Sequence, residues 1–166
     1  LKLKNYSLIS IAVLRRILSV TLILGSQLKI DNELVTVSIN EDKPLKQIIA
    51  TSNNSYKVKE YCSNPACILF PNKANYLNVD VTLAMETHSY KDYKLKELYS
   101  HAVNFISGEI AEGFAYYFAQ SEQTPSAFGL GVLLNKDDCS LKTSDGFIIQ
   151  LMSHASEDTI KRLLKV

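Results

Sequence analysis

The longest apolar run of the chain, from Leu8 to Leu24, predicts a buried helix. We expect it to begin near Ser7, to end at Gly25 as a C-cap, and to carry Arg15 and Arg16 on one narrow polar edge. Each arginine, at the centre of a membrane span, would cost about 2.5–3.5 kcal/mol on an insertion scale. The pair also interrupts the apolar core that a signal peptide needs. The pattern therefore favours a core helix over a membrane span or a signal peptide.

After this helix the apolar positions recur at every second residue, which is typical of half-buried strands. The alternation predicts strands over residues 35–39, 45–51, 56–61 and 77–83. The following segment, 86–98, is rich in lysine and tyrosine without clear periodicity, and we expect a loop there. Val103 and Phe105 mark another short strand. A largely antiparallel sheet is the natural inference from so many short alternating segments.

A second helix is predicted to open at Ser107 and Gly108 and to stop before Pro125. Glu109 and Glu112 fall in its first turn, where the positive end of the helix dipole favours carboxylates. Its apolar residues lie on one helical face; they are Ile110, Phe114, Tyr117 and Phe118.

The last third of the chain returns to strands and closes with a short helix. Residues 127–134 predict a strand whose glycines, Gly129 and Gly131, mark a bulge or a close backbone approach. A turn over 135–138 leads to a strand over 147–152, which its continuous apolar character predicts to be buried. Ser156 should cap a final helix with Ile160, Leu163 and Leu164 on one side. These elements predict an α+β fold, with largely antiparallel sheet packed against a few helices, in one domain over 1–166.

Composition and charge narrow the classes of function. The chain has 166 residues, 46% of them hydrophobic and 21% charged, which is ordinary for one globular domain and excludes a fully disordered chain. Its net charge of +1 carries no electrostatic footprint of a nucleic-acid partner or an anionic membrane.

The residue types that usually carry chemistry are scattered. Three cysteines, an odd count with no C-x-x-C, disfavour a disulfide framework, and we interpret them as small buried hydrophobes in a reducing compartment. They are Cys62, Cys67 and Cys139. The histidines match no metal-ligand spacing; they are His88, His101 and His154. Neither a G-x-S-x-G elbow nor a phosphate-binding loop is present. Glu109 and Glu112 share a helix face, so an acid–base pair is conceivable beside the helix-dipole explanation.

Three neighbouring segments together resemble the signature of the thirty-three-kilodalton chaperonin family, the redox-regulated heat-shock holdases of the bacterial cytosol. They are Ser107-Gly-Glu-Ile-Ala-Glu112, Ala115-Tyr-Tyr-Phe118 and Ser121-Glu-Gln-Thr-Pro-Ser-Ala127. Gly129-Leu-Gly-Val-Leu-Leu134 and Gly146-Phe-Ile-Ile-Gln150 extend the resemblance, which covers most of the chain. One departure lies inside the signature: Gly113 stands where the family commonly has aspartate.

The resemblance implies a chaperone, not an enzyme, that binds unfolding client proteins under oxidative or heat stress and prevents their aggregation. It also implies a cytoplasmic homodimer without nucleic-acid or membrane partners. The resemblance further implies that the redox switch of the family lies in a separate zinc domain, whose cysteine ligands are spaced as C-x-C and C-x-x-C. The cysteines of this chain do not fall on those positions, so we expect no cofactor here and zinc only in a carboxyl-terminal domain outside this chain. The first residue, Leu1, is not an initiator Met, which suggests part of a longer product.

Two functional classes stay open beside the holdase. The chain could serve as a dimerisation scaffold whose apolar faces are used by a second copy, with client binding elsewhere. It could also be a small hydrolase that uses Glu109 and Glu112. As client-binding candidates we take four aromatic residues, each with core packing as its alternative; they are Phe105, Phe114, Tyr117 and Phe118.

Overall fold

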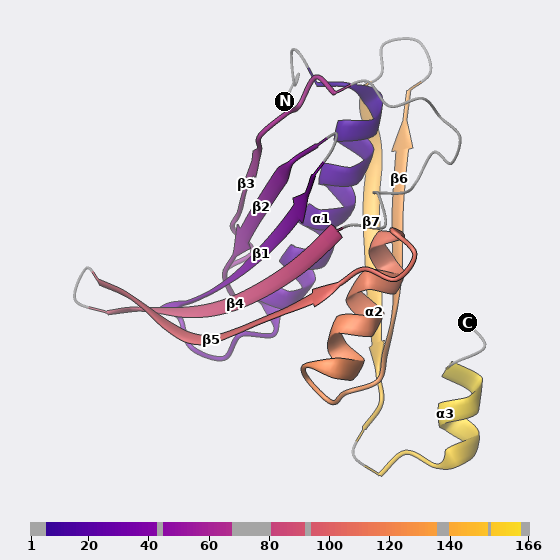
Figure 1. Ribbon diagram of the computed structural model, residues 1–166. Coiled ribbons are helices and arrows are strands. Elements are labelled where there is room, and N and C mark those ends of the chain that lie inside the picture. Colours follow the sequence, from indigo (N-terminus) through magenta and orange to yellow (C-terminus); the bar gives the residue numbers. More distant parts are fainter. Residues whose placement is uncertain are drawn as a thin grey trace.

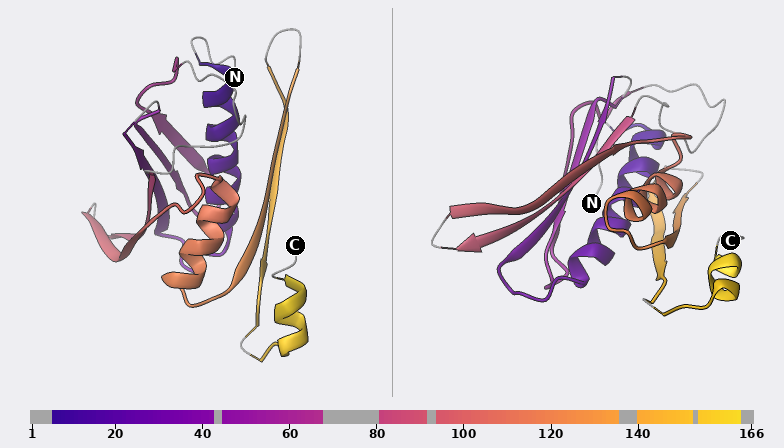
Figure 2. Two further views of the ribbon diagram at one scale, coloured as in Figure 1. Left: turned by 45° about the vertical axis from the view of Figure 1, so that its right-hand side comes forward. Right: turned by 60° about the horizontal axis from the view of Figure 1, so that its bottom comes forward.

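Three layers make up the part of the chain that the computed structural model describes, namely residues 6–42, 45–67, 81–91, 94–135, 140–152 and 154–163. A five-stranded sheet and a two-stranded ribbon lie on opposite sides of the helices α1 and α2 (Figures 1 and 2). The elements are α1 (Leu8–Ser26), β1 (Glu33–Glu41), β2 (Gln47–Ser52), β3 (Val58–Cys62), β4 (Val81–Lys91), β5 (Lys94–Asn104), α2 (Ile110–Gln120), β6 (Ser126–Leu134), β7 (Leu141–Gln150) and α3 (Glu157–Leu163). This arrangement confirms the predicted α+β class with antiparallel sheets.

Helix α1 is the central element of the fold. The hydroxyl of Ser7 caps its first turn by accepting from the Ser10 backbone N–H at 3.1 Å, as predicted. The predicted C-cap at Gly25 is wrong, because the helix continues to Ser26 and Gln27 caps it. Gly25 is buried, and a Cβ atom there would come within 2.7 Å of the Ser52 Cβ atom of β2. A glycine is therefore required for close helix–sheet contact.

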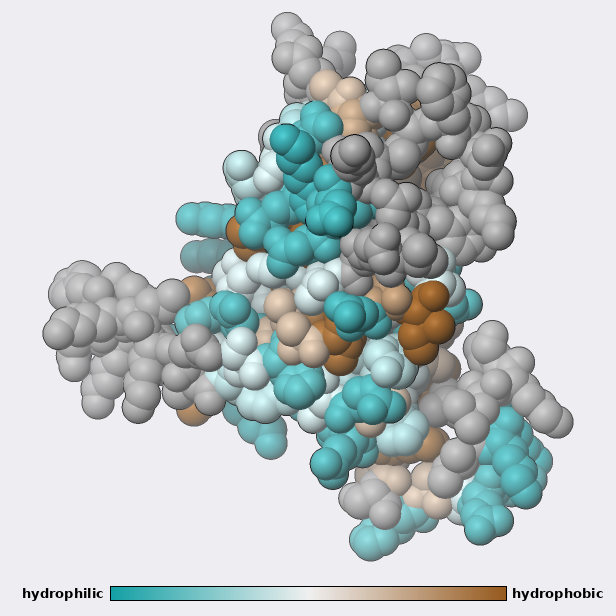
Figure 3. Space-filling view, viewed as in Figure 1, coloured by the Kyte–Doolittle hydropathy of each residue, from teal (hydrophilic) through white to brown (hydrophobic). Residues whose placement is uncertain are grey.

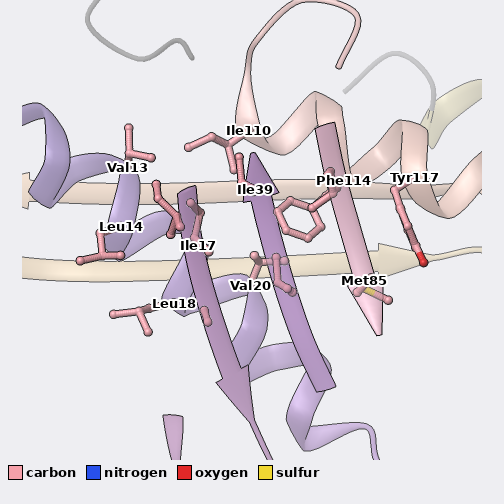
Figure 4. Packing of buried hydrophobic residues seen from close by; sticks show 14 of the residues in the cluster. Val13, Leu14, Ile17, Leu18, Val20, Ile39, Met85, Ile110, Phe114 and Tyr117 are labelled. Atoms are coloured by element: carbon pink, nitrogen blue, oxygen red, sulfur yellow. The ribbon is translucent and has the colours of Figure 1, made fainter. Parts of the chain in front are cut away.

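The five-stranded sheet has the order β3-β2-β1-β4-β5, and every neighbouring pair is antiparallel. Residues of β1 alternate between the two faces, so Val35, Val37 and Ile39 are buried against α1 while the residues between them are more exposed. Figure 4 shows the core side chains of both helices pointing into the space beside these strands. The predicted strands over 35–39, 45–51 and 56–61 correspond to β1, β2 and β3, with β3 starting at Val58.

The loop predicted over 86–98 is wrong. Strands β4 and β5 form a long hairpin there, with a register shift between Thr87 and His88. Figure 1 shows the end of this hairpin reaching beyond the rest of the sheet. The lysine- and tyrosine-rich sequence of this segment carries no regular alternation of apolar and polar residues, so its strands are not visible as a pattern. Of the strand predicted over 77–83, residues 77–80 lie outside the described residues.

Helix α2 and the β6–β7 ribbon follow in sequence. The helix ends at Gln120, five residues before Pro125, and β6 covers the strand predicted over 127–134. The buried strand predicted over 147–152 is wrong in extent and in burial. Strand β7 runs from Leu141 to Gln150, and Phe147 and Ile149 are exposed on either side of the partly buried Ile148.

The final helix, α3, is confirmed. Ser156 accepts from the Thr159 backbone N–H at 3.3 Å, and Glu157 and Asp158 occupy the first turn. Leu164, the turn over 136–138 and Cys139 lie outside the described residues, and so do the side chains of Ile160 and Leu163.

Candidate functional surface

All four aromatic residues predicted as client contacts lie in the core. Phe114 and Tyr117 are fully buried, and Phe105 and Phe118 are at most 5% exposed. In this arrangement none of them offers surface to another protein. A role in client binding would require α2 to leave the sheet and the ribbon.

These aromatic side chains instead hold the ribbon in place. The rings of Phe114 and Phe118 lie 5.7 Å and 5.3 Å from the ring of Phe128 on β6, and Tyr117 meets Phe118 edge-on at 6.0 Å. Aromatic pairs at these separations contribute about 0.5–1.5 kcal/mol each beyond the area they bury. Burial raises the pKa of the Tyr117 phenol, and the nearby Tyr99 and Glu122 raise it further, so Tyr117 stays neutral in the core.

Phe105 also packs closely against α2. Its ring occupies the space beside Gly113, where a Cβ atom would overlap it. A side chain at position 113 would therefore displace Phe105 from the core.

The two faces of the β6–β7 ribbon differ in chemistry. Its inner face contacts the helices: Phe128, Leu130 and Ile148 pack against the core, and the Ser144 hydroxyl donates to the Arg15 carbonyl at 3.2 Å. The outer face consists of the alternate residues of each strand. On β6 these are Ala127, Gly129, Gly131 and Leu133; the residues paired with them on β7 are Ile149, Phe147, Asp145 and Thr143.

This outer face exposes large apolar side chains. Phe147 is 51% exposed, Leu133 50% and Ile149 46%, and Met152 just beyond β7 is 84% exposed. In the left view of Figure 2 most of this side of the ribbon has no described element beside it, and α3 lies next to its lower end. Elsewhere, on the side shown in Figure 3, apolar residues form separate small patches among pale and polar ones. Several large apolar residues on one face are typical of an interaction surface.

The sequence predicts a buried strand over 147–152 and does not indicate that one of its faces is exposed. Phe147, Ile148 and Ile149 form a continuous apolar run, which does not show which side faces solvent. The glycines of β6 predict a bulge or a close backbone approach, and the structure shows neither at Gly129 and Gly131. The side chains of Phe147 and Asp145 occupy the space beside them, and the irregularity of the ribbon lies between Leu133 and Leu134.

The carboxylates of Glu109 and Glu112 have structural partners. Glu109 caps α2, since one oxygen accepts from the Ala111 backbone N–H at 2.6 Å and the other lies 3.9 Å from the Arg16 guanidinium. Glu112 accepts from the Ser107 hydroxyl. Both carboxylates are therefore engaged in starting the helix, which disfavours the acid–base interpretation.

The arginines of α1 join the layers. Arg15 lies 3.9 Å from Glu60 on β3, and Arg16 makes its contact with Glu109 at the start of α2. By length and composition α1 could cross a membrane. Its apolar residues, however, pack between the sheet and the ribbon, and its arginines meet carboxylates, as expected of a core helix.

The histidines have separate surroundings. His88 is buried with its Nε2 atom 3.5 Å from Glu86, His101 meets the ring of Tyr117 edge-on at 6.1 Å, and His154 is exposed. Among the described residues no three acidic, histidine or cysteine side chains are grouped as metal ligands.

Comparison with known proteins places this fold. The family model described as Hsp33 protein matches residues 1–165. This chain belongs to the Hsp33 family. A 33 kDa chaperonin from Agathobacter rectalis is 43% identical over 155 residues, which are 93% of this chain and 54% of the relative. One from Clostridioides difficile is 40% identical over 98% of this chain and 56% of the relative.

A solved structure agrees with this assignment to the Hsp33 family. The crystal structure of a 33 kDa chaperonin from Thermotoga maritima superposes with a TM-score of 0.82 at 31% identity, over 96% of this chain and 55% of that chain. The present chain thus spans about half the length of these Hsp33 relatives. Their name supports a chaperone function for the family.

Proposed function

We propose that this chain is the client-binding part of a holdase, a chaperone that binds unfolding proteins and prevents their aggregation. The observation that carries the proposal is the outer face of the β6–β7 ribbon, where Phe147, Ile149 and Leu133 are about half exposed. Membership of the Hsp33 family supports it.

The outer face fits the requirements of reversible capture. Complete burial of one fully exposed large apolar side chain contributes about 1.5–3 kcal/mol, so two or three residues that are already half buried supply roughly 1.5–4.5 kcal/mol before the costs of association. That range supports dissociation constants weaker than about micromolar, which allow clients to be released. The inner face of the ribbon is fixed by Phe128, Leu130 and Ile148 against the core, so the outer face needs no unfolding to be presented.

We also propose that control of capture lies outside this chain. The family resemblance implies a zinc-binding redox domain with C-x-C and C-x-x-C ligands, and the described cysteines, Cys62 and Cys67, are buried and match neither spacing. Capture by the isolated chain should then be the same with reductant and with peroxide. The resemblance further supports a homodimer in the cytoplasm.

The test is light scattering from a thermally unfolding client enzyme mixed with the purified chain. Wild type should suppress scattering, and the double variant Phe147→Ser/Ile149→Ser should lose most of this suppression. A matched control is Ile30→Ser/Ile106→Ser, which removes two residues that are 57% and 70% exposed outside the ribbon. The control should behave as wild type. Equal suppression by both double variants, or none by wild type, would contradict the proposal.

The second candidate is a dimerisation scaffold, and the same outer face favours it because a second copy could cover Phe147 and Ile149. Sedimentation at several concentrations with an apolar-surface dye separates the two. Dye binding that persists in the dimer supports the chaperone. Dye binding that disappears as the dimer forms supports the scaffold.

A further inference from the structure

The two methionines of the chain lie in opposite surroundings. Met85 on β4 pairs with Val37 of β1 and is 7% exposed in the core. Met152 comes shortly after β7 and is 84% exposed, the largest exposed fraction of any large apolar residue in the described part of the chain. One thioether is therefore packed among apolar neighbours, while the other is open to solvent.

The backbone holds Met152 at the end of the ribbon. The Leu151 N–H donates to the Pro125 carbonyl at 3.2 Å, which continues the pairing of β6 with β7 by one residue pair. The Ala155 N–H donates to the Met152 carbonyl at 2.9 Å. Because Met152 comes three residues after Ile149, their Cα atoms are at most about 11 Å apart. An extended client segment that covers Ile149 therefore needs only a few more residues to reach Met152.

The chemistry of methionine suits such a contact. Its side chain is unbranched, flexible and polarisable, so it adapts to apolar partners of many shapes, and methionine is common on surfaces that bind many different sequences. Its thioether is also open to oxidation, and the resulting sulfoxide is polar and disrupts apolar contacts. An exposed methionine beside a client surface thus combines a binding group and an oxidant-sensitive group in one side chain.

We propose that Met152 is a client contact whose oxidation to the sulfoxide lowers capture, an inference that rests on the proposed function of the outer face. The oxidants are N-chloro compounds, which transfer chlorine to sulfur. The Met152 sulfur attacks the chlorine and the N–Cl bond breaks; water then adds to the sulfur as chloride leaves, and both protons of the water pass to the nitrogen. One thioether, one N-chloro sulfonamide anion and one water give one sulfoxide, one sulfonamide and one chloride.

This step differs from oxidation by hydrogen peroxide. A thioether has no proton to lose and therefore no thiolate form, so it reacts slowly with peroxide and rapidly with chlorine-transfer oxidants. Capture by the isolated chain should then be unchanged by a short peroxide treatment and lowered by an N-chloro compound.

Peptide mapping of the folded 166-residue chain tests the site. After treatment with graded amounts of chloramine-T, an N-chloro sulfonamide, Met152 should carry an added oxygen while Met85 stays unoxidised. In urea both methionines should react. Circular dichroism shows whether the treated chain is folded. Oxidation of Met85 as fast as Met152 in the folded chain would overturn the assignment.

Client affinity tests the consequence. The probe is a fluorescently labelled protein kept unfolded by reduction and alkylation of its cysteines, and fluorescence anisotropy measures its dissociation constant. Chloramine-treated wild type should bind about tenfold more weakly than untreated wild type, because the apolar contact of one large side chain is lost. Met152→Gln, whose polar side chain resembles the sulfoxide, should show the same loss without treatment. Methionine sulfoxide reductase should restore the affinity of the treated wild type.

Two matched variants separate Met152 from every other oxidised group. Met152→Leu keeps an apolar side chain without sulfur and should retain its affinity through the same treatment. Met85→Leu should lose affinity on treatment as wild type does.

The outcomes distinguish this inference from the function on which it rests. Failure of the untreated chain to bind the probe would contradict client binding itself. Binding that is unchanged when Met152 carries the sulfoxide, or an equal loss in treated Met152→Leu, would overturn the role of Met152 and leave client binding in place.

Discussion

The ring of Phe147 on β7 lies across the backbone of Gly129, its directly paired residue on β6. A Cβ atom on Gly129 would overlap that ring, so the pair allows a large aromatic side chain to lie flat on a two-stranded ribbon. The exposed surface proposed to bind clients therefore depends on a residue without a side chain.

Gly129→Ala should displace the Phe147 ring and destabilise the fold by up to about 1 kcal/mol, because the half-exposed ring can swing away and only its own contacts are lost. Urea denaturation measures this free energy of unfolding. Gly131→Ala is the matched control on the same face, because its nearest neighbour is the flexible carboxylate of Asp145, which can move away. It should change the free energy of unfolding by less than about 0.5 kcal/mol. Equal losses in the two variants would show that Phe147 does not occupy this place.

Alanine variants of Phe114 and Phe147 should show which residue maintains the stability of the fold and which one binds clients. Phe114 is fully buried between the helices and the sheet, so Phe114→Ala should lower the free energy of unfolding by about 3–5 kcal/mol. Phe147→Ala should cost about 1 kcal/mol or less because half of its surface is already exposed. Urea denaturation and client light scattering together test this. A folded Phe114→Ala protein with lost capture, beside a Phe147→Ala protein with full capture, would return the client site to α2.

Glu109 should matter for stability and Glu112 much less. Glu109→Ala removes the cap of α2 and the partner of Arg16, which should cost about 1–2 kcal/mol. Glu112→Ala removes an exposed bond to Ser107 and should cost under about 0.5 kcal/mol. Thermal unfolding ranks the two. The reverse order would mean that the helix start is held by other contacts.

The sequence predicted most elements because their burial follows a regular period. Helix α1, helix α2 and strand β1 each bury one face, and that face is visible as spacing in the residues. The sequence does not predict the hairpin of β4 and β5, because its residues carry no regular alternation of apolar and polar positions. Gly25 predicts a C-cap, but it is a glycine because its backbone packs against Ser52 of β2, a residue of a different element. Such a contact between distant segments leaves no periodic trace.

The candidate surface was predictable only in part. Phe114, Tyr117 and Phe118 are aromatic and lie on one helical face, which is the pattern of a binding surface and also of a core-facing helix. Phe147 and Ile149 lie in a continuous apolar run, which predicts a buried strand and does not distinguish its two sides. Pairing with β6 decides which residues point outward, and pairing is a property of two strands together.

Glu60 should make the free energy of unfolding depend on pH in the direction opposite to that of a typical carboxylate. Burial raises the pKa of this carboxyl above its ordinary 4.5, because the cost of desolvation outweighs the attraction of Arg15. Between the unfolded-state and the folded-state pKa the folded protein binds more protons, so stability falls as pH rises through this window. Glu60 therefore subtracts stability at neutral pH, and the loss disappears as pH falls below the unfolded-state value.

Replacement by a neutral residue of similar shape isolates this effect. The difference in unfolding free energy, Glu60→Gln minus wild type, should be more positive at neutral pH than below 4.5, where wild-type Glu60 is itself protonated. Urea denaturation across this range measures it, and comparing the difference between the two pH values cancels any constant effect of losing the contact with Arg15. Glu157→Gln alters an exposed carboxylate on α3, and its free energy of unfolding should change with pH as that of wild type does. If the free energy of unfolding of Glu60→Gln also changed with pH as that of wild type does, Glu60 would be as ionised in the folded state as in the unfolded chain, and its contact with Arg15 would offset its burial.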